Sequence, residues 1–364
     1  MTDQLQIDGE KLSYHPARVA QWAEAQDDWE KARKVYPVYI EVSPMGACNH
    51  RCTFCAVDYI GYQMRKLDIF HLKRALSEMG AAGVKSVMFA GEGEPLLFKP
   101  LAETVVHSAA SGLDVGITTN AVPLTRTFCE EALGSVQWIK ASVNAGSAET
   151  YAKIHKTDPR DFERALRNME TAAVLKESGG LKKCRLGIQM VLLPENAGEA
   201  HALAQRAKEI GVDYVVIKPY SQHLKGISRV YEGIEYSQYY HLAEHLEKLN
   251  DDRFHVVFRR HTMEKLQQER SYSVCQATPF FWAYIMANGD LYGCSAYLND
   301  TRFCYGNIHE QGFREIWEGE KRRQNFEYVR SQLDISECRT NCRMDEVNRY
   351  LWKVRFPPEH ISFI

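Results

Sequence analysis

The stretch that decides the fold is residues 38–55, which read VYIEVSPMGACNHRCTFC. Residues 38–42 form a short apolar run typical of a buried strand, and three cysteines follow in a loop. Cys48, Cys52 and Cys55 are spaced so that one chain segment can wrap one face of an iron-sulfur cluster. Three thiolates leave one iron of a four-iron cluster open, much as a catalytic zinc keeps a vacant position. The stretch therefore predicts a strand that leads into a cluster-binding loop.

Strand and helix patterns alternate on either side of this loop. The expected strands are 38–42, 86–89, 114–118, 138–143, 186–192 and 214–217. The expected helices are 69–81, 101–111, 125–133, 162–176 and 198–210. This alternation predicts an α/β fold with a parallel sheet, and six repeats favour a partial (β/α)6 barrel of the TIM type. Active sites of such sheets lie at the carboxyl ends of the strands, where the cysteine loop is expected.

The sequence changes character after Tyr272. Apolar residues 280–286, a turn signal at 288–289 and a second apolar pair at 291–292 predict a β-hairpin. We therefore expect a small C-terminal α+β domain. The predicted organisation is a helical arm (1–35), the barrel (36–225), a linking helical segment (226–270), the auxiliary domain (271–345) and a tail (346–364).

Composition excludes several classes of partner. The chain has 364 residues with 45 basic and 47 acidic side chains, so its formal charge of -2 gives no field that would attract nucleic acid or an anionic membrane. No apolar run approaches the roughly 18 residues of a membrane span, and residues 1–10 lack a secretory signal. A cytoplasmic protein is expected. Ten cysteines in that compartment indicate metal or redox chemistry rather than disulfides.

The spacing of Cys48, Cys52 and Cys55, with the aromatic Phe54 before the last cysteine, resembles the hallmark of the radical S-adenosylmethionine (SAM) superfamily. The resemblance implies that SAM binds the open iron of a 4Fe-4S cluster through its amino and carboxylate groups. An electron from the cluster would break the sulfonium to give a 5'-deoxyadenosyl radical, which takes hydrogen from the substrate. A flavodoxin or ferredoxin is the reductant that the resemblance implies.

Residues 91–95, Gly-Glu-Gly-Glu-Pro, resemble the GGEP motif of that family in an altered glycine register. The resemblance implies that Gly93 and Glu94 bind SAM, with Glu94 accepting a hydrogen bond from the methionine ammonium. Further cofactor contacts, to ribose or carboxylate, are implied for residues at strand ends: Asn120, Ser142, Asn144 and Gln189. Short polar residues at strand ends are also ordinary turn formers, and that alternative stays open.

A second cysteine set lies in the C-terminal region, where a turn can bring the two arms of the hairpin to one site. Cys275, Gly289 and Cys294, followed by Cys338 and Cys342, resemble the SPASM and Twitch auxiliary domains of radical SAM enzymes. With five cysteines in this region, we expect one auxiliary 4Fe-4S cluster held by the four cysteines just named. Four cysteines also satisfy structural zinc, which is the alternative.

Cys304 is left over from this set. It is predicted to be a buried thiol, and the alternatives are a spare ligand or a hydrogen donor that quenches a substrate radical in an epimerase. Cys129 and Cys184 are predicted to be packing residues. The basic run 321–323 is predicted to be the solvated face of a charged helix.

These features favour an enzyme that abstracts hydrogen from a small polar, sugar-like or aminocyclitol-like substrate, giving oxidation or epimerisation. Twitch relatives include aminocyclitol dehydrogenases, whereas larger SPASM relatives modify peptides and proteins. An arm of about 35 residues is short for a separate leader-peptide domain, which favours the small molecule over a peptide or protein side chain. A non-catalytic iron-sulfur or zinc module in electron transfer is the alternative of another class, but it would not need residues 91–95.

Overall fold

One curved sheet organises the computed structural model, which describes residues 9–362. Its strands are β1 (Tyr39–Val42), β2 (Ser86–Phe89), β3 (Asp114–Thr119), β4 (Trp138–Ser142), β5 (Arg185–Leu192), β6 (Tyr214–Pro219), β7 (His255–Phe258), β8 (Trp282–Ile285), β9 (Asp290–Tyr292) and β10 (Cys304–Asn307). The strand order is β10-β9-β8-β1-β2-β3-β4-β5-β6-β7. Every pair from β8 through β1 to β7 is parallel, and β9 and β10 add antiparallel neighbours.

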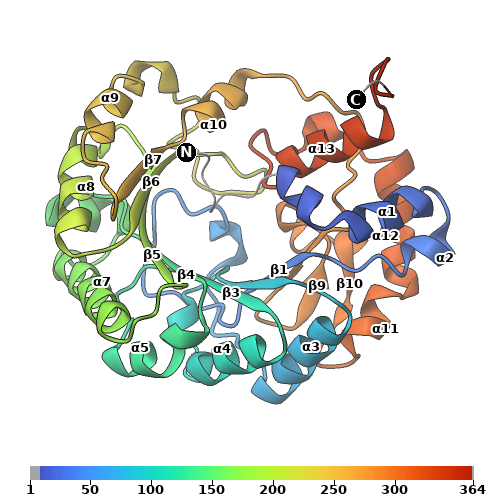
Figure 1. Ribbon diagram of the computed structural model, residues 1–364, viewed down its shortest axis with the longest axis horizontal. Helices are drawn as coiled ribbons and strands as arrows, with labels where there is room; N and C mark the ends of the chain where they lie inside the picture. The colour runs from blue at the N-terminus through green and yellow to red at the C-terminus, as the bar shows by residue number, and fades with distance from the viewer. Residues whose placement is uncertain (1–8, 363–364) are drawn as a thin grey trace.

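Helices line the outer side of the parallel strands (Figure 1). The α-helices are α1 (Pro16–Ala25), α2 (Trp29–Ala32), α3 (Ile69–Ala81), α4 (Leu101–Ala110), α5 (Arg126–Ala132), α6 (Ala148–His155), α7 (Arg160–Ser178), α8 (Ala200–Glu209), α9 (Leu242–Glu247), α10 (Arg260–Glu264), α11 (Phe313–Trp317), α12 (Glu320–Ser331) and α13 (Asp345–Arg355). Side-chain oxygens of Asp68, Thr125 and Ser147 cap α3, α5 and α6. Within residues 9–362, no helix is both long and apolar enough to cross a bilayer.

The two faces of the sheet differ in chemistry. Ile139 and Ile217 belong to the large apolar core that also contains residues of the outer helices. Because successive strand residues point to opposite faces, Lys140 and Lys218 lie on the inner face. The outer face therefore supplies the core, and the inner face is left to line the lumen of the barrel.

Two aromatic rings fill the amino-terminal end of the lumen because glycines stand opposite them. A Cβ added to Gly116 would lie 2.3 Å from the Trp138 ring, and one added to Gly187 would lie 2.1 Å from the Tyr214 ring. Each glycine is also the register partner of its aromatic residue on the next strand. The rings form a floor beneath the polar residues that lie nearer the strands' carboxyl ends.

The N-terminal helices pack on the C-terminal region rather than on the barrel helices (Figure 1). Trp22 of α1 lies 6.2 Å from Phe281, and Trp29 of α2 lies 5.7 Å from Phe326 of α12, measured between ring centroids. Arg322, which is fully buried, sits between α2 and α11. These contacts fix the C-terminal region against the start of the chain.

All six predicted strands are confirmed, each with ends within two residues of the expected ones. A seventh parallel strand, β7, lies in the segment 226–270 that was expected to be helical, and it pairs with β6. The predicted hairpin is also confirmed as β8 and β9, but β8 pairs with β1 and so extends the barrel sheet. Helix α13 crosses the boundary predicted at 345, and the domain limits themselves stay predictions.

The prediction for the basic run 321–323 is wrong for one residue. Lys321 and Arg323 are exposed as expected, whereas Arg322 has no exposed surface. Its guanidinium donates to backbone carbonyls from α2 to the loop before β8 and lies 4.1 Å from the Trp317 ring centroid. A local charge pattern cannot reveal this environment because the partners come from distant segments.

Candidate active site

The loop after β1 places the cysteine triplet at the carboxyl edge of the parallel strands. The backbone N–H groups of Arg51 and Thr53 donate to the carbonyls of His155 and Ile154 at the end of α6, over 2.9 and 2.8 Å. The Thr53 hydroxyl lies 3.0 Å from the Tyr231 hydroxyl. The loop is thus anchored on a helix that begins beyond β4.

The three thiols lie close enough together to act on one another. Burial is the main cause that raises the pKa of Cys48 to about 11, and Glu94 and Cys55 raise it further. Burial also raises the pKa of Cys52 well above its usual value, with Cys55 and Cys48 adding to the effect. Three buried thiolates would repel one another unless a cationic centre bound them. Soft sulfur donors in this arrangement fit an iron-sulfur cluster.

Two histidines that the sequence analysis passed over lie against the triplet. His155 Nδ1 is 3.0 Å from Cys52 Sγ, and His155 Nε2 is 2.9 Å from the Val143 carbonyl oxygen. Because a carbonyl can only accept, Nε2 carries the proton and Nδ1 faces the sulfur as an acceptor. One ligand atom each of His50, Cys52 and His155 lies within 4.8 Å of the others. No spacing signal reveals this, since His155 is distant in sequence.

Glu94 lies beside the cysteine loop at the end of β2. Its backbone N–H donates to the Ala47 carbonyl over 2.9 Å, and its buried carboxylate accepts from Thr119 Oγ1 at 2.5 Å and from the Asn120 N–H at 2.8 Å. Burial raises the pKa of Glu94 to about 7. A carboxylate held this way can accept a further hydrogen bond from an ammonium group.

The glycines of residues 91–95 allow this segment to approach the cysteine loop. A Cβ on Gly91, whose φ is +130°, would lie 2.3 Å from Ser43, and a Cβ on Gly93 would lie 2.3 Å from the carbonyl oxygens of Met45 and Ala47. Any larger residue would push the two segments apart. The altered glycine register therefore has a packing role, whereas direct contact of Gly93 with SAM stays a prediction.

The other predicted cofactor residues already have partners within the protein. Asn120 Nδ2 donates to Asn49 Oδ1 over 2.7 Å, next to the cysteine loop, and Gln189 Nε2 lies 3.4 Å from Ser142 Oγ. Asn144 is fully buried, and its Oδ1 accepts the Val191 N–H at 2.7 Å. Its side chain thus joins β4 to β5. Phe54 lies 5.7 Å from His155, ring to ring. Their roles as SAM contacts stay predictions.

Replacing Glu94 with glutamine is expected to weaken SAM binding about tenfold or more at pH 8, because a charged hydrogen bond to the ammonium is lost. The wild-type affinity should fall as the pH drops below about 7, where Glu94 takes up a proton. Glu94→Gln should show no such dependence. Titration calorimetry with SAM at pH 6 and pH 8 measures both effects.

The buried Glu94 carboxylate also lowers the stability of the folded protein when it is ionised. Since its folded pKa of about 7 lies above the usual value of 4.5, ionised Glu94 opposes folding increasingly as the pH rises between these values. Glu94→Gln without SAM should therefore unfold at a higher temperature at pH 8. For SAM affinity, Glu92→Gln is the matched control, because buried Glu92 accepts from the Ala287 N–H instead. Equal SAM affinity in wild type and Glu94→Gln would contradict the prediction that Glu94 binds the methionine ammonium of SAM.

The C-terminal cysteines come together as predicted for a second site. Burial is the main cause that raises the pKa of Cys294, Cys338 and Cys342, and for each of them Cys275 is a further cause. Tyr297 Oη lies 3.3 Å from Cys338 Sγ, and Asn348 Nδ2 lies 3.6 Å from Cys275 Sγ. Four soft donors gathered in one region fit one further cluster, and the same donors would fit zinc.

Cys304 stands apart from this four-thiol set. Burial raises its pKa with Asp290 as the next cause, and no other cysteine contributes. Its Sγ lies 3.9 Å from the Gly306 carbonyl oxygen, and it is half-buried. A role as hydrogen donor stays a prediction. Cys129 and Cys184 are buried among apolar side chains, which confirms their packing role.

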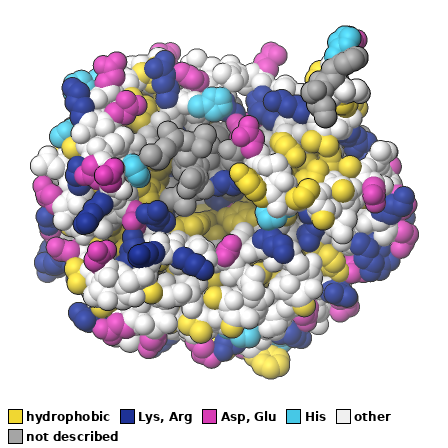
Figure 2. Space-filling view, viewed as in Figure 1, with side chains coloured by type: hydrophobic (Ala, Val, Ile, Leu, Met, Phe, Trp, Pro, Cys, Tyr) yellow, Lys and Arg dark blue, Asp and Glu magenta, His cyan; other side chains and the backbone are white. Residues whose placement is uncertain are grey.

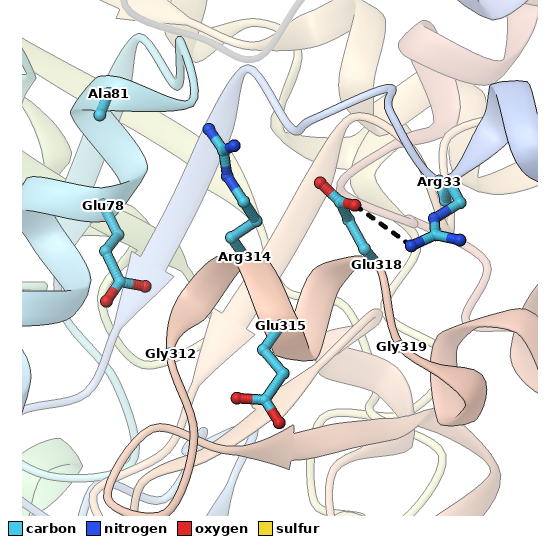
Figure 3. A pocket seen from close by; sticks show the side chains of 8 residues that line it. All are labelled: Arg33, Glu78, Ala81, Gly312, Arg314, Glu315, Glu318 and Gly319. Atoms are coloured by element: carbon cyan, nitrogen blue, oxygen red, sulfur yellow. Dashed lines mark hydrogen bonds and ion pairs between the residues drawn. The ribbon is translucent and has the colours of Figure 1, made fainter.

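A surface cleft outside the barrel is unrelated to the cysteines (Figure 3). It lies between α3 and α11, and Glu78 and Arg314 are among its lining residues. An ion pair of 3.4 Å joins Arg33 to Glu318 at its side.

The fold and the two cysteine sites define a radical SAM protein with an auxiliary iron-sulfur domain. The model of the radical SAM superfamily matches residues 42–207, and that of an iron-sulfur cluster-binding domain, SPASM, matches residues 275–343. The chain belongs to the radical SAM superfamily, in its SPASM subgroup. Its cofactors are accordingly 4Fe-4S clusters and SAM.

Curated relatives of the chain are enzymes. A GTP 3',8-cyclase of Chlorobaculum tepidum is 30% identical over 33% of this chain and 37% of that enzyme, so the chain matches well under two thirds of its length. An AdoMet-dependent heme synthase of Methanosarcina barkeri is 24% identical over 83% of this chain and 86% of the synthase. The names of these relatives show that they act on different molecules.

Solved structures support the fold. Streptococcus suis SuiB bound to its precursor peptide SuiA superposes with a TM-score of 0.66 at 17% identity, covering 98% of this chain and 80% of SuiB. The protein anSMEcpe with bound AdoMet gives 0.58 at 15% identity, covering 88% and 97%. At such identities the likeness concerns the fold alone.

Proposed function

We propose that the protein cleaves SAM reductively and removes hydrogen from a small polar, sugar-like or aminocyclitol-like substrate, with oxidation or epimerisation as the outcome. The observation that carries this proposal is the polar inner face of the barrel next to the cysteine loop. Lys140, Ser142, Gln189 and Lys218 line this face above the aromatic floor. Such a lumen offers hydrogen bonds rather than apolar contact.

Each group of residues would have its own role in this reaction. Cys48, Cys52 and Cys55 would hold the cluster that, once reduced, supplies the 5'-deoxyadenosyl radical from bound SAM. Glu94 would orient the methionine ammonium, and Asn120 lies next to it through its N–H bond to the Glu94 carboxylate. The four-thiol set would hold an auxiliary cluster. A flavodoxin or ferredoxin in the cytoplasm would be the electron source.

The proposal is tested with anaerobically reconstituted protein, which should be brown and contain roughly eight irons per chain for two four-iron clusters. A strong reductant and SAM should release 5'-deoxyadenosine. Sugar phosphates, aminocyclitols and short peptides are then added separately, and the rate of release is compared. Stimulation by a small polyol supports the proposal, whereas stimulation by peptides alone contradicts the substrate class. Absence of 5'-deoxyadenosine from iron-loaded protein contradicts the activity itself.

A further inference from the structure

A long loop follows strand β6. Residues 220–235 connect β6 to the short 3-10 helix Tyr236–Tyr239 and contain no helix or strand. Loops of this length without secondary structure are uncommon in compact domains and are usually functional. The hydroxyl of buried Tyr236 accepts the Tyr220 N–H at 2.6 Å and donates to the Leu192 carbonyl over 3.0 Å. One side chain thus closes the two ends of the loop, as in an Ω-loop.

The loop spans the mouth of the barrel. Trp138 and Tyr214 fill the amino-terminal end of the lumen, so the carboxyl end is the side from which a ligand can enter along the barrel axis. The loop starts at the carboxyl end of β6 and contacts Asp58, which follows β1, and Leu298, which follows β9. In the sheet, β2 to β5 lie between β1 and β6. The loop therefore runs from one side of the mouth to the other.

Asp58 holds the middle of the loop. Its carboxylate oxygens accept the backbone N–H groups of Ile227 at 2.9 Å and Ser228 at 3.0 Å. The neighbouring Tyr59 ring stacks on the His223 ring, with centroids 5.1 Å apart and planes inclined by 21°. Hydrogen bonds to an ionised carboxylate are stronger than bonds between neutral groups. The contact with the segment after the cysteine loop thus depends mainly on one side chain.

The same stretch also contacts the auxiliary region. Lys225 Nζ donates to the Leu298 carbonyl over 2.9 Å, and His223 Nε2 lies 3.3 Å from the Ser295 carbonyl oxygen. Residues 222–230, named the flap below, therefore connect the barrel strand β6 to both the first and the last part of the sheet.

The flap is bonded within itself and fixed at both ends. Tyr220 and Tyr231, which flank it, are buried and pack on each other, with ring centroids 5.7 Å apart. Gln222 Nε2 donates to the Ser228 carbonyl over 3.1 Å, from one end of the flap to the other. The flap is thus able to move as one body between two fixed tyrosines.

Apolar burial contributes little to holding the flap down. Ile227 and Val230 are 73% and 72% exposed. Figure 2 shows that exposed apolar side chains also occur among charged ones elsewhere on the surface, so their exposure by itself marks no function. It does mean that the few polar contacts described above hold the closed position. Segments with few buried apolar contacts are those that open locally.

We propose that the flap is a gate, which opens to admit SAM and the substrate to the barrel, and that the Asp58 carboxylate is its latch. The inference goes beyond the proposed function and rests on it only in the choice of SAM as the ligand. Asp58 is a positioning residue that keeps the flap closed whether or not SAM is bound. Loss of the latch therefore raises the rates of SAM entry and exit by the same factor and leaves the affinity unchanged.

The test compares SAM binding in wild type and Asp58→Ala, both reconstituted anaerobically and kept without reductant so that SAM stays intact. Association and dissociation are followed by stopped-flow absorbance of the cluster, and affinity by calorimetry. Both rates should rise about tenfold or more in Asp58→Ala, because two charge-assisted hydrogen bonds are lost, at an unchanged Kd. Asp251→Ala is the matched control. Asp251 also accepts two backbone N–H groups, at 2.8 and 2.9 Å, but lies before β7 at the other end of the barrel.

Limited proteolysis detects the opening itself. Lys225 and Arg229 are exposed residues of the flap and offer trypsin two cleavage sites. Cleavage there requires the flap to leave its closed position, so Asp58→Ala should be cut about tenfold faster or more, and Asp251→Ala at the wild-type rate. The unfolding temperature of Asp58→Ala is measured alongside, since a general loss of structure would lower it and expose other sites as well.

Each outcome decides the proposal. Faster SAM entry and exit at unchanged affinity, together with faster cleavage in the flap, supports the gate. Wild-type SAM rates in Asp58→Ala overturn it, even if cleavage is faster, because ligands then enter by another route. Weaker SAM affinity with a lower unfolding temperature also overturns it and assigns Asp58 a structural role. These results leave the proposed function intact, whereas failure of iron-loaded wild type to bind SAM would refute that function and the gate with it.

Discussion

Replacing any one of Cys48, Cys52 and Cys55 with alanine is expected to lower 5'-deoxyadenosine formation at least about a thousandfold, because the reductive step has no source of electrons without its cluster. The iron content should fall by about four per chain, the number in one cluster. No fourth thiol can take the place of the one removed, because Cys48 and Cys55 are the only cysteines among the groups that shift the pKa of Cys52.

The measurement combines iron content, visible absorbance and chromatography of 5'-deoxyadenosine after anaerobic reconstitution. Cys129→Ala is the control, because Cys129 is a buried packing residue on α5 and should leave the iron content unchanged. Retention of the full iron complement in Cys52→Ala would disprove the ligand assignment. Replacement of Cys294 should also remove about four irons but leave the triplet cluster in place.

Arg322→Met should lower the free energy of unfolding by about 4 kcal/mol, the range found when a buried charged network loses its donor. The guanidinium donates to the carbonyls of Pro279, Trp317 and Ala32 over 3.0, 2.8 and 3.2 Å. A methionine fills much of the space but donates nothing, so these buried carbonyls lose their partner. The stacking on Trp317 is lost as well.

The loss is measured as the shift in the guanidinium chloride midpoint at unchanged slope. Arg323→Met on the same helix is the matched control. Arg323 is exposed and pairs with Glu327 one turn away, a contact of about 0.3–0.5 kcal/mol. Equal midpoints for the two variants would show that burial of Arg322 contributes nothing.

The predictable part of the fold came from local patterns. Apolar runs gave all six expected strands, and amphipathic spacing gave the helices around them, because each such element depends mainly on its own residues. Strand β7 was missed because residues 255–258 form a short run in a polar surrounding. Pairing of β8 with β1 could not be inferred either, since it joins segments more than 200 residues apart and has no local signal.

By itself, the sequence predicted the cluster ligands. Cys48, Cys52 and Cys55 lie within eight residues, so their spacing alone defines a shared site. Only the tertiary structure decided the environment of that site. His155 contacts Cys52 from α6, and Arg339 donates to Ser221 Oγ from the C-terminal region. The tertiary structure also buries Arg322, whereas its neighbours in the basic run 321–323 are exposed. The physical reason is that burial and partners depend on distant segments, whereas ligand spacing within a loop does not.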